Sequence, residues 1–297
     1  MELDQILSNW NITDETVKQI YSTAWQVGDK YVLKTGSDLN SLKNNLTLIK
    51  ALAEQNIPVA EIMKTKDGTD YVVIDKDYYF LSKKINGEHI TDIYNPKFKE
   101  TAFTFGEVLG RLHKAFLNCQ ERISCHENSF FEEITGWVRE TFKDKKISLI
   151  PAEILEEIII SLEVIYPKLP RQLIHRDIHP GNLLFGNRIL TGYIDFDLSR
   201  IDIRIFDLCY MALGLLIGNT SDSEKSGKWF EILHNMAAGY QTVIPLTDDE
   251  KKAVPVIMVS IELLFTAYFT NENKPELAEN AADMLVWLSE RKENIRI

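Results

Sequence analysis

The chain has 297 residues, of which 45% are hydrophobic, and a formal net charge of -11 from 33 basic and 44 acidic side chains. This length is large for one compact core and predicts two lobes, while the hydrophobic content is ordinary for a soluble globular protein. The acidic excess argues against nucleic acid or an anionic membrane as the main partner. A phosphate site must therefore be built locally, from a few basic groups, backbone N–H groups and a metal.

Three features of the sequence indicate a cytoplasmic protein. The three cysteines, Cys119, Cys125 and Cys209, have no metal-ligand spacing and are expected to be reduced thiols. The N-terminus lacks a basic segment followed by an apolar one, so we expect no secretory signal. Apolar runs such as residues 254–269 are too short or too interrupted to span a bilayer.

The N-terminal region predicts a small sheet of about five strands. After a short amphipathic start at residues 1–10, period-2 patterns separated by turn residues indicate strands. The expected strands are residues 16–21, 25–27, 30–34, 59–64, 71–74 and 78–81. Gly28-Asp29 is a two-residue hairpin signal between the second and the third of them.

One helix is expected to interrupt these strands, at residues 38–55. Its apolar side chains recur at helical spacing, at Leu42, Leu46, Ile49 and Leu52. Asp38 is placed to cap the start of the helix, and Asn56 is placed to end it.

The remainder of the chain is predominantly helical by its periodicity. Helices are expected at residues 98–115, 130–143, 150–166, 208–218, 225–240, 247–269 and 275–292. In the first of these helices, Gly106 and Gly110 lie four residues apart and permit another helix to approach closely. His113 is expected to be a buried, hydrogen-bonded core residue rather than a ligand.

Residues 173–197 interrupt this helical region and carry the polar groups of greatest interest. They read as strand, loop, strand, turn and strand, with Asp177, Asn182 and Asp195 beside apolar residues. Two carboxylates and an amide at the ends of buried strands are costly unless they are paired or hold a metal. Hard oxygen ligands of this kind suit Mg²⁺.

The motif H-R-D-x-x-x-x-N, here His175 to Asn182, matches the catalytic loop of kinases. The fuller pattern H-x-D-x-H-P-G-N followed by I-D-F-D resembles the aminoglycoside phosphotransferase and choline kinase family, which includes homoserine, methylthioribose and fructosamine kinases. The resemblance implies that Asp177 is the catalytic base and that Asn182 and Asp195 hold Mg²⁺. The alternative is a polar loop in an unrelated fold.

The resemblance also implies a fold of class α+β, the bilobal protein-kinase-like fold. A small antiparallel-sheet lobe with one main helix would cover residues 1–81, a hinge would cover 82–87, and a larger, mostly helical lobe would cover 88–297. ATP or GTP would be the phosphoryl donor. The expected partners are this nucleotide and a small-molecule acceptor, with no nucleic acid and no membrane, in a monomer or homodimer.

In the small lobe, the resemblance assigns the nucleotide contacts. Lys34 ends a strand in V-L-K and matches the lysine that meets the α- and β-phosphates. Ser22 and Thr23 would offer hydroxyl and N–H groups in the loop above the phosphates, or would be ordinary turn residues. The predicted hinge residues that bind the adenine are Phe80, Leu81, Ser82 and Lys83.

The family's helix glutamate, which pairs with the strand lysine, has no equivalent here. The matching position is Asn45. Lys34 is therefore held either by the nucleotide and Asp195 alone, or by an uncharged hydrogen bond from Asn45.

In the large lobe, Asp207 matches an aspartate that hydrogen-bonds the backbone of the catalytic loop. His175 would support this loop, and His179 would touch the acceptor or only pack. Acids near the motif and on a late helix are expected to form a negative lining that attracts an amine-bearing acceptor. They are Asp197, Asp202, Glu262 and Glu272, and a merely solvated surface is the alternative.

These residues favour a kinase that phosphorylates a hydroxyl group of a small, amine-bearing molecule such as homoserine, an amino alcohol or an aminoglycoside. The missing helix glutamate favours a second hypothesis, a non-catalytic nucleotide-binding regulator with a kinase fold. A protein-Ser/Thr kinase ranks last, because residues 197–207 are too short for a peptide-docking activation segment.

Overall fold

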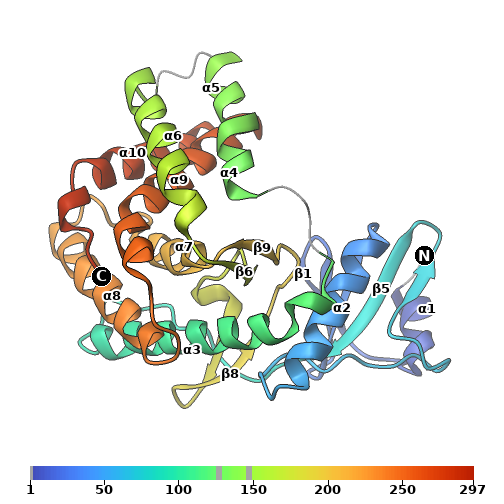
Figure 1. The fold of residues 1–297 in the computed structure, drawn as a ribbon. Coiled ribbons are helices and arrows are strands. Elements are labelled where there is room, and N and C mark those ends of the chain that lie inside the picture. Colours follow the sequence, from blue (N-terminus) through green and yellow to red (C-terminus); the bar gives the residue numbers. More distant parts are fainter. Residues whose placement is uncertain (1–2, 125–128, 145–148) are drawn as a thin grey trace. The chain divides into compact units, whose positions relative to one another are not determined.

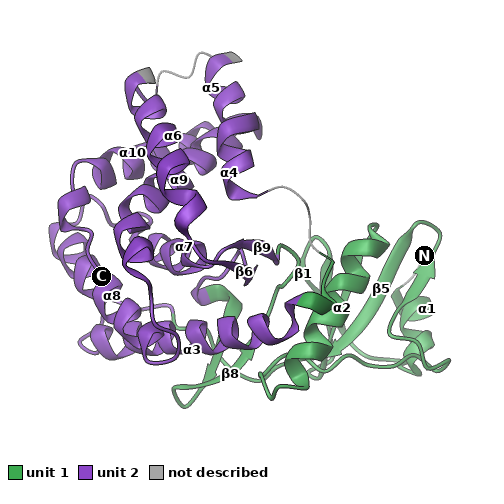
Figure 2. Cartoon of the chain, viewed as in Figure 1, with its two compact units in different colours: residues 1–90, 121–124, 181–198 green, residues 91–120, 125–180, 199–297 purple. Residues whose placement is uncertain are grey.

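The computed structural model describes residues 3–124, 129–144 and 149–297 (Figure 1). It contains two compact units, which are coloured separately in Figure 2. The first unit comprises residues 1–90, 121–124 and 181–198, and the second comprises residues 91–120, 125–180 and 199–297. The lobe division predicted at residues 82–87 stays a prediction, and it did not foresee that residues 181–198 group with the N-terminal segment.

The first unit is built on one five-stranded sheet in which all neighbouring strands are antiparallel. It follows a short helix, α1 (Leu3–Leu7), and a 3-10 turn. The strands are β1 (Val17–Tyr21), β2 (Ala24–Val27), β3 (Tyr31–Gly36), β4 (Val72–Ile74) and β5 (Asp77–Lys83), in the order β1-β2-β3-β5-β4. The predicted small sheet is confirmed.

The main helix of this unit, α2 (Leu39–Ala53), begins and ends at the predicted signals. The Asp38 carboxylate accepts hydrogen bonds from the first backbone N–H groups of the helix, as an N-cap does. Asn56, just after the helix, has the left-handed φ of 60° that its ending requires. The buried face of α2 packs through Leu42 and Leu46 against Phe80 of β5.

The strand predicted at residues 59–64 is wrong. Val59 and Ile62 form isolated bridges with two different partners, Tyr193 and Ser82, so no continuous ladder develops. The segment instead fastens two elements of the unit to each other.

A second hairpin joins this unit from far along the chain. Strands β7 (Leu183–Gly186) and β8 (Ile189–Tyr193) are antiparallel, and Asn187 and Arg188 turn between them with positive φ. The hairpin is tied to the unit by backbone bonds, since Tyr193 N–H donates to Pro58 O and Glu88 exchanges two hydrogen bonds with Phe185.

The second unit contains a close helix pair, α3 (Phe98–Cys119) and α8 (Ser223–Gln241) (Figure 1). A Cβ atom on Gly106 would lie 1.8 Å from Met236 O, and one on Gly239 would lie 2.0 Å from Phe103 O. Only glycine permits these contacts, so the close approach predicted at Gly106 is confirmed. The unit also holds a two-stranded antiparallel sheet, β6 (Arg171–Ile174) with β9 (Arg200–Ile203).

The other helices of this unit follow the predicted order with shifted ends. They are α4 (Phe130–Glu133), α5 (Arg139–Asp144), α6 (Ala152–Ile165), α7 (Ile205–Leu216), α9 (Asp248–Asn271) and α10 (Pro275–Ser289). The single helix predicted at residues 130–143 is interrupted by a π-helical turn at residues 134–138, where Gly136 leaves helical geometry.

The structure bears on two further expectations, which concern the apolar run in α9 and the cysteines. The expectation that residues 254–269 are too short or too interrupted to span a bilayer is wrong by length and composition, because α9 would reach across one, although 67% of its most apolar stretch is buried inside the fold. Of the described cysteines, Cys119 and Cys209 are buried and form no disulfide. Cys125 lies outside the described residues.

Candidate active site

The β7–β8 hairpin brings two of the three motif residues to one end of the first unit. Leu183 pairs with Tyr193, and the next pair outward is closed by Ile194 N–H, which donates to Asn182 O at 3.1 Å. Asp195 follows at once, with a left-handed φ of 68°. A non-glycine residue in this conformation costs about 1–3 kcal/mol and is typical of functional sites. Asn182 is buried, whereas the Asp195 side chain is 46% exposed.

Lys34 reaches this end of the hairpin from β3. Its Nζ lies 2.9 Å from Asp195 Oδ1 and 3.6 Å from Asp197 Oδ2. Burial lowers the pKa of Lys34, but attraction to Asp197 and Asp195 outweighs it and leaves this pKa above its ordinary value. The side chain is therefore a firmly charged ammonium group, suited to phosphate oxygens.

Asn45 does not hydrogen-bond Lys34 directly, because its Oδ1 has no hydrogen-bond partner among the described residues. Its Nδ2 donates to Asp197 Oδ1, and Asp197 in turn contacts Lys34. The two-residue bridge of Asn45 and Asp197 thus occupies the position where the family places a glutamate. Asp197, which we expect to line the acceptor site, lies two residues past Asp195 and contacts Lys34, and its contact with an acceptor stays a prediction.

Two of the residues predicted to bind the nucleotide lie in a turn of the sheet. Ser22 and Thr23 form the exposed turn between β1 and β2, and Thr23 O accepts a hydrogen bond from Thr35 N–H, next to Lys34. Their phosphate-binding role stays a prediction. The turn that carries them lies at the same end of the sheet as Lys34.

The predicted hinge residues are already engaged within the unit. Phe80, Leu81 and Ser82 are buried in β5, Leu81 O accepts from Met63 N–H, and Lys83 N–H donates to Glu61 O. These residues form the end of an inner strand, which continues to Lys83. The adenine contact assigned to them stays a prediction.

The second unit holds the third motif residue, Asp177. Its Oδ1 accepts a hydrogen bond of 2.6 Å from the hydroxyl of Tyr210, on α7. Burial and the Asp177 charge raise the pKa of Tyr210, so the phenol stays a neutral donor. Sequence reasoning missed Tyr210, although its place one helical turn after Asp207 is a signal that could have found it.

The loop before Asp177 is held by the buried Asp207. This carboxylate accepts from the backbone N–H groups of His175 at 2.7 Å and of Arg176 at 2.9 Å. His113 Nε2 lies 3.0 Å from it, and Nδ1 lies 2.9 Å from the Tyr240 hydroxyl. The roles expected for Asp207 and for the buried His113 are both confirmed by this geometry.

Of the acids expected to line an acceptor site, Asp197 and Glu272 are exposed, whereas Asp202 and Glu262 are buried. Asp202 is fully buried and accepts from Phe130 N–H and from the Tyr166 hydroxyl, each at 2.7 Å. Glu262 is buried on α9, and burial raises its pKa to about 8. Glu262 therefore carries little charge at neutral pH, and its contact with an acceptor stays a prediction. The contact of His179 with an acceptor also stays a prediction, and its side chain is half-buried.

The residues at the hairpin end fit a magnesium ion. Asp195 and Asp197 bring two carboxylates to one lysine, and burial followed by repulsion from Asp195 raises the pKa of Asp197. This surplus of negative charge favours a cation. Among the described residues no group of three or more His, Cys, Asp or Glu side chains is placed to hold a metal. Asp195 and Asn182 would thus act with nucleotide phosphates, as is usual for Mg²⁺.

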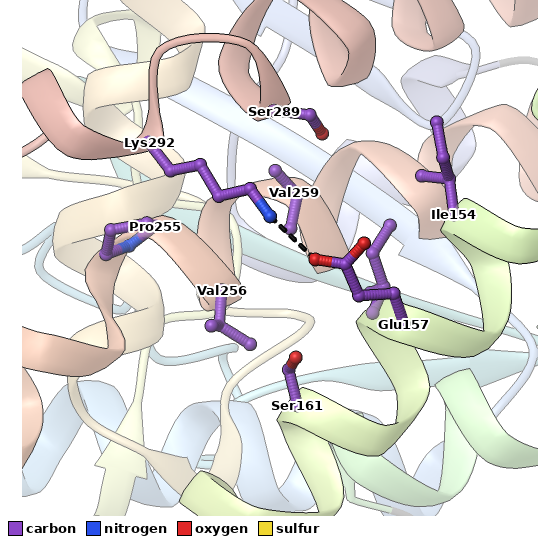
Figure 3. Close-up of a pocket in the computed structure, with 9 residues that line it drawn as sticks. Ile154, Glu157, Ser161, Pro255, Val256, Val259, Ser289 and Lys292 are labelled. Carbon is purple, nitrogen blue, oxygen red and sulfur yellow. Dashed lines mark hydrogen bonds and ion pairs between the residues drawn. The ribbon is translucent and has the colours of Figure 1, made fainter.

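A separate cavity of 140 Å³ lies in the second unit, among α6, α9 and the residues after α10 (Figure 3). Its walls are apolar at Ile154, Val256 and Val259, and the ion pair between Glu157 and Lys292 spans it at 2.7 Å. None of the motif residues lines it, so it is not the candidate active site.

The sequence matches the phosphotransferase enzyme family model over residues 17–246. This match covers most of the chain and includes every motif residue described above. The chain therefore belongs to the phosphotransferase enzyme family.

Among its curated relatives are homoserine kinases. That of Zymomonas mobilis is 26% identical over 228 residues, which are 74% of this chain and 66% of the relative. That of Polaromonas naphthalenivorans is 29% identical over 154 residues, which are 51% of this chain and 47% of the relative. The chain thus spans about two thirds of the first relative and about half of the second.

Solved structures show that the fold is that of the small-molecule kinases. An amicoumacin kinase in complex with AMP-PNP, Ca²⁺ and its substrate superposes with a TM-score of 0.73 at 15% identity, covering 95% of this chain and 91% of that one. A microcompartment-associated aminopropanol kinase gives 0.70 at 15% identity, covering 99% and 98%. The predicted kinase-like α+β fold is confirmed.

Proposed function

We propose that this protein transfers the γ-phosphate of ATP or GTP to a hydroxyl group of a small, amine-bearing acceptor, with Mg²⁺. The observation that carries the proposal is the contact of Lys34 with Asp195 beside Asn182, in a chain of the phosphotransferase family. A lysine, a metal-binding carboxylate and an amide are the minimum that a kinase needs to hold a triphosphate.

On the donor side, Lys34 would bind phosphate oxygens, while Asn182 and Asp195 would hold the metal. Mg²⁺, when bound, neutralises charge on the transferred group. Asp197 and Asn45 would keep the ammonium of Lys34 in place when its contact with Asp195 is exchanged for a phosphate. The turn at Ser22 and Thr23 would add hydroxyl and N–H donors.

On the acceptor side, Asp177 would orient the attacking hydroxyl and take its proton. Tyr210 donates to one oxygen of this carboxylate, Oδ1, which fixes the plane of the carboxylate and directs its remaining lone pairs. A hydroxyl group is a poor nucleophile at neutral pH, so orientation by Asp177 would matter as much as its basicity. Asp207 keeps the loop that carries this base in one conformation.

The amine on the acceptor is proposed from chemistry that the relatives share. Homoserine and aminopropanol, the compounds in the names of two of the matched kinases, each carry a hydroxyl and an amine. Glu262 is the residue that we propose for the amine, because a buried carboxyl group ionises readily once a cation lies beside it.

The alternative of a non-catalytic nucleotide-binding regulator is weakened by the structure. It was favoured by the missing helix glutamate, yet Asp197 places a second carboxylate 3.6 Å from Lys34. A protein that only binds nucleotide has no need of the Asp177–Tyr210 pair.

The direct test is an ADP-release screen with ATP and with GTP against homoserine, amino alcohols, aminoglycosides and neutral sugars. We expect turnover with an amine-bearing acceptor, and we expect Asp177→Asn to lower kcat by at least about a hundredfold, with nucleotide affinity little changed. Tyr210→Phe is the matched control, because it removes only the donor to Asp177 and should retain more activity. Turnover of Asp177→Asn near that of the wild type would remove Asp177 from the mechanism.

A further inference from the structure

An ionic cluster in the second unit surrounds the side chain of Glu133, the last residue of α4. Its Oε2 accepts hydrogen bonds of 2.6 Å from Arg176 Nη2 and from Arg200 Nη2, and its Oε1 accepts one of 3.1 Å from Arg200 Nη1. Both arginine side chains are 10% exposed, and that of Glu133 is 20% exposed. One carboxylate thus joins two buried guanidinium groups in the short, forked geometry of strong charge-assisted bonds.

Arg176 stands directly before Asp177, and its conformation is unusual. Its φ is 73°, a left-handed value that a residue with a long side chain adopts only when its surroundings impose it. The backbone N–H is held by Asp207, and the guanidinium lies 3.9 Å from the ring centre of Phe206. Glu133 supplies the third restraint, at the end of the side chain.

The same cluster fastens α4 to the small sheet of this unit. Asp202, on β9, accepts from the backbone N–H of Phe130 at the start of α4 and lies 3.3 Å from Arg200. Ser129 closes the helix start with a capping box. The position of Glu133 is therefore fixed by these contacts at the start of its helical turn and by the two arginines at the end of its own side chain.

The charges explain why an anion is needed here. Burial, followed by repulsion from Arg200, lowers the pKa of Arg176. Without Glu133, the two guanidinium groups would face each other, and the cluster would keep only the Asp202 carboxylate, which lies 3.3 Å from Arg200. In regulated protein kinases, an arginine of this kind is ordered by a phosphate group that another enzyme adds. Here the chain itself supplies the anion.

We propose that Glu133 is a positioning residue for phosphoryl transfer: a permanent anion that holds Arg176 in its left-handed conformation and, through it, sets the direction of Asp177. The inference rests on the proposed role of Asp177 as the base. It implies a catalytic loop that is formed without any modification. It also implies that α4 and the loop move together.

The test compares Glu133→Gln with Glu156→Gln. Glu156 pairs with Arg139 through two short hydrogen bonds in the same unit, so its change removes an ion pair, more exposed than that of Glu133, that does not touch Arg176. We expect Glu133→Gln to lower kcat by about ten- to a hundredfold, as for a slightly misplaced catalytic group, with the KM for nucleotide within about twofold of the wild type. Glu156→Gln should keep its kcat.

Anion rescue separates positioning from mere stability. Glu133→Ala leaves space between the two arginines, and acetate should restore part of its kcat at saturating substrates, but not that of Asp177→Asn. A double variant with Arg176→Gln should be no slower than Arg176→Gln alone, because both changes break one restraint. Should Glu133→Gln fold poorly, Glu133→Asp, which keeps the charge, should retain a higher kcat than Glu133→Ala.

The outcomes are distinguishable. If Glu133→Gln turns over like the wild type while Asp177→Asn is inactive, the inference is wrong and the proposed function stands. The inference is also wrong if acetate raises the melting temperature of Glu133→Ala without raising its kcat. If Asp177→Asn itself keeps its turnover, the proposed function fails instead.

Discussion

Glu262 offers the sharpest test of the structure, because its carboxyl group is buried in the middle of α9. Burial raises its pKa from 4.5 to about 8. In the unfolded chain the group loses its proton near pH 4.5, whereas in the folded protein it keeps the proton until about pH 8. Between these values the unfolded state binds fewer protons, so stability falls as pH rises, and the loss is complete above pH 8.

The size of the effect follows from this shift. Between pH 4.5 and pH 7, an interval of about 2.5 pH units, the unfolded chain releases this proton while the folded protein keeps it. This difference corresponds to about 3 kcal/mol of stability lost at pH 7. Glu262→Gln replaces the acid with a neutral group of the same shape that does not titrate. We therefore expect the variant to match the wild type near pH 4.5, and to become more stable than the wild type by up to about 3 kcal/mol at pH 7.

Thermal unfolding followed by circular dichroism from pH 5 to pH 8.5 measures this difference. Glu272→Gln is the matched control, since Glu272 is exposed at the end of the same helix. A melting-temperature difference between Glu262→Gln and the wild type that is the same at pH 5 and pH 8 would refute the reasoning. It would mean that the carboxyl group is hydrated or paired in solution.

Two further predictions concern the donor side. Asp195→Ala should abolish the Mg²⁺-dependent part of nucleotide binding, and Asn182→Ala should weaken it less, because a neutral ligand contributes less to a hard cation. Calorimetric titrations of nucleotide with and without Mg²⁺ measure this, and an unchanged Mg²⁺ response in Asp195→Ala would place the metal elsewhere. Asn45→Ala removes a hydrogen bond to a carboxylate worth about 1.5–3 kcal/mol and should raise the nucleotide Kd by about tenfold. A loss as large as that of Lys34→Ala would show that the lysine depends wholly on Asn45.

Much of the fold and half of the candidate site could be predicted because their signals are local. The N-cap residue and the spacing of the apolar residues predict α2, and the structure shows both the cap and the buried apolar face. Asn182 and Asp195 meet because a hairpin of alternating residues closes between them. Such features depend on residues near one another in sequence, where turn chemistry and periodicity decide the structure.

The features that were missed depend on tertiary contacts. Residues 59–64 have a strand-like composition, but their bridge partners lie in two different elements, and no local signal reveals this. The strand β5 continues into the first two residues of the expected hinge, Ser82 and Lys83. Glu61 and Met63 add backbone hydrogen bonds to this strand. Tyr210 reaches Asp177 only once α7 has packed against the loop.

The acids expected near an acceptor differ in their exposure. Asp197 and Glu272 are exposed, whereas Asp202 and Glu262 are buried. The buried Asp202 and Asp207 accept hydrogen bonds that hold α4 and the loop before Asp177. We propose that Glu262 contributes to holding a positively charged acceptor, because its buried carboxyl group would exchange its proton for the cation.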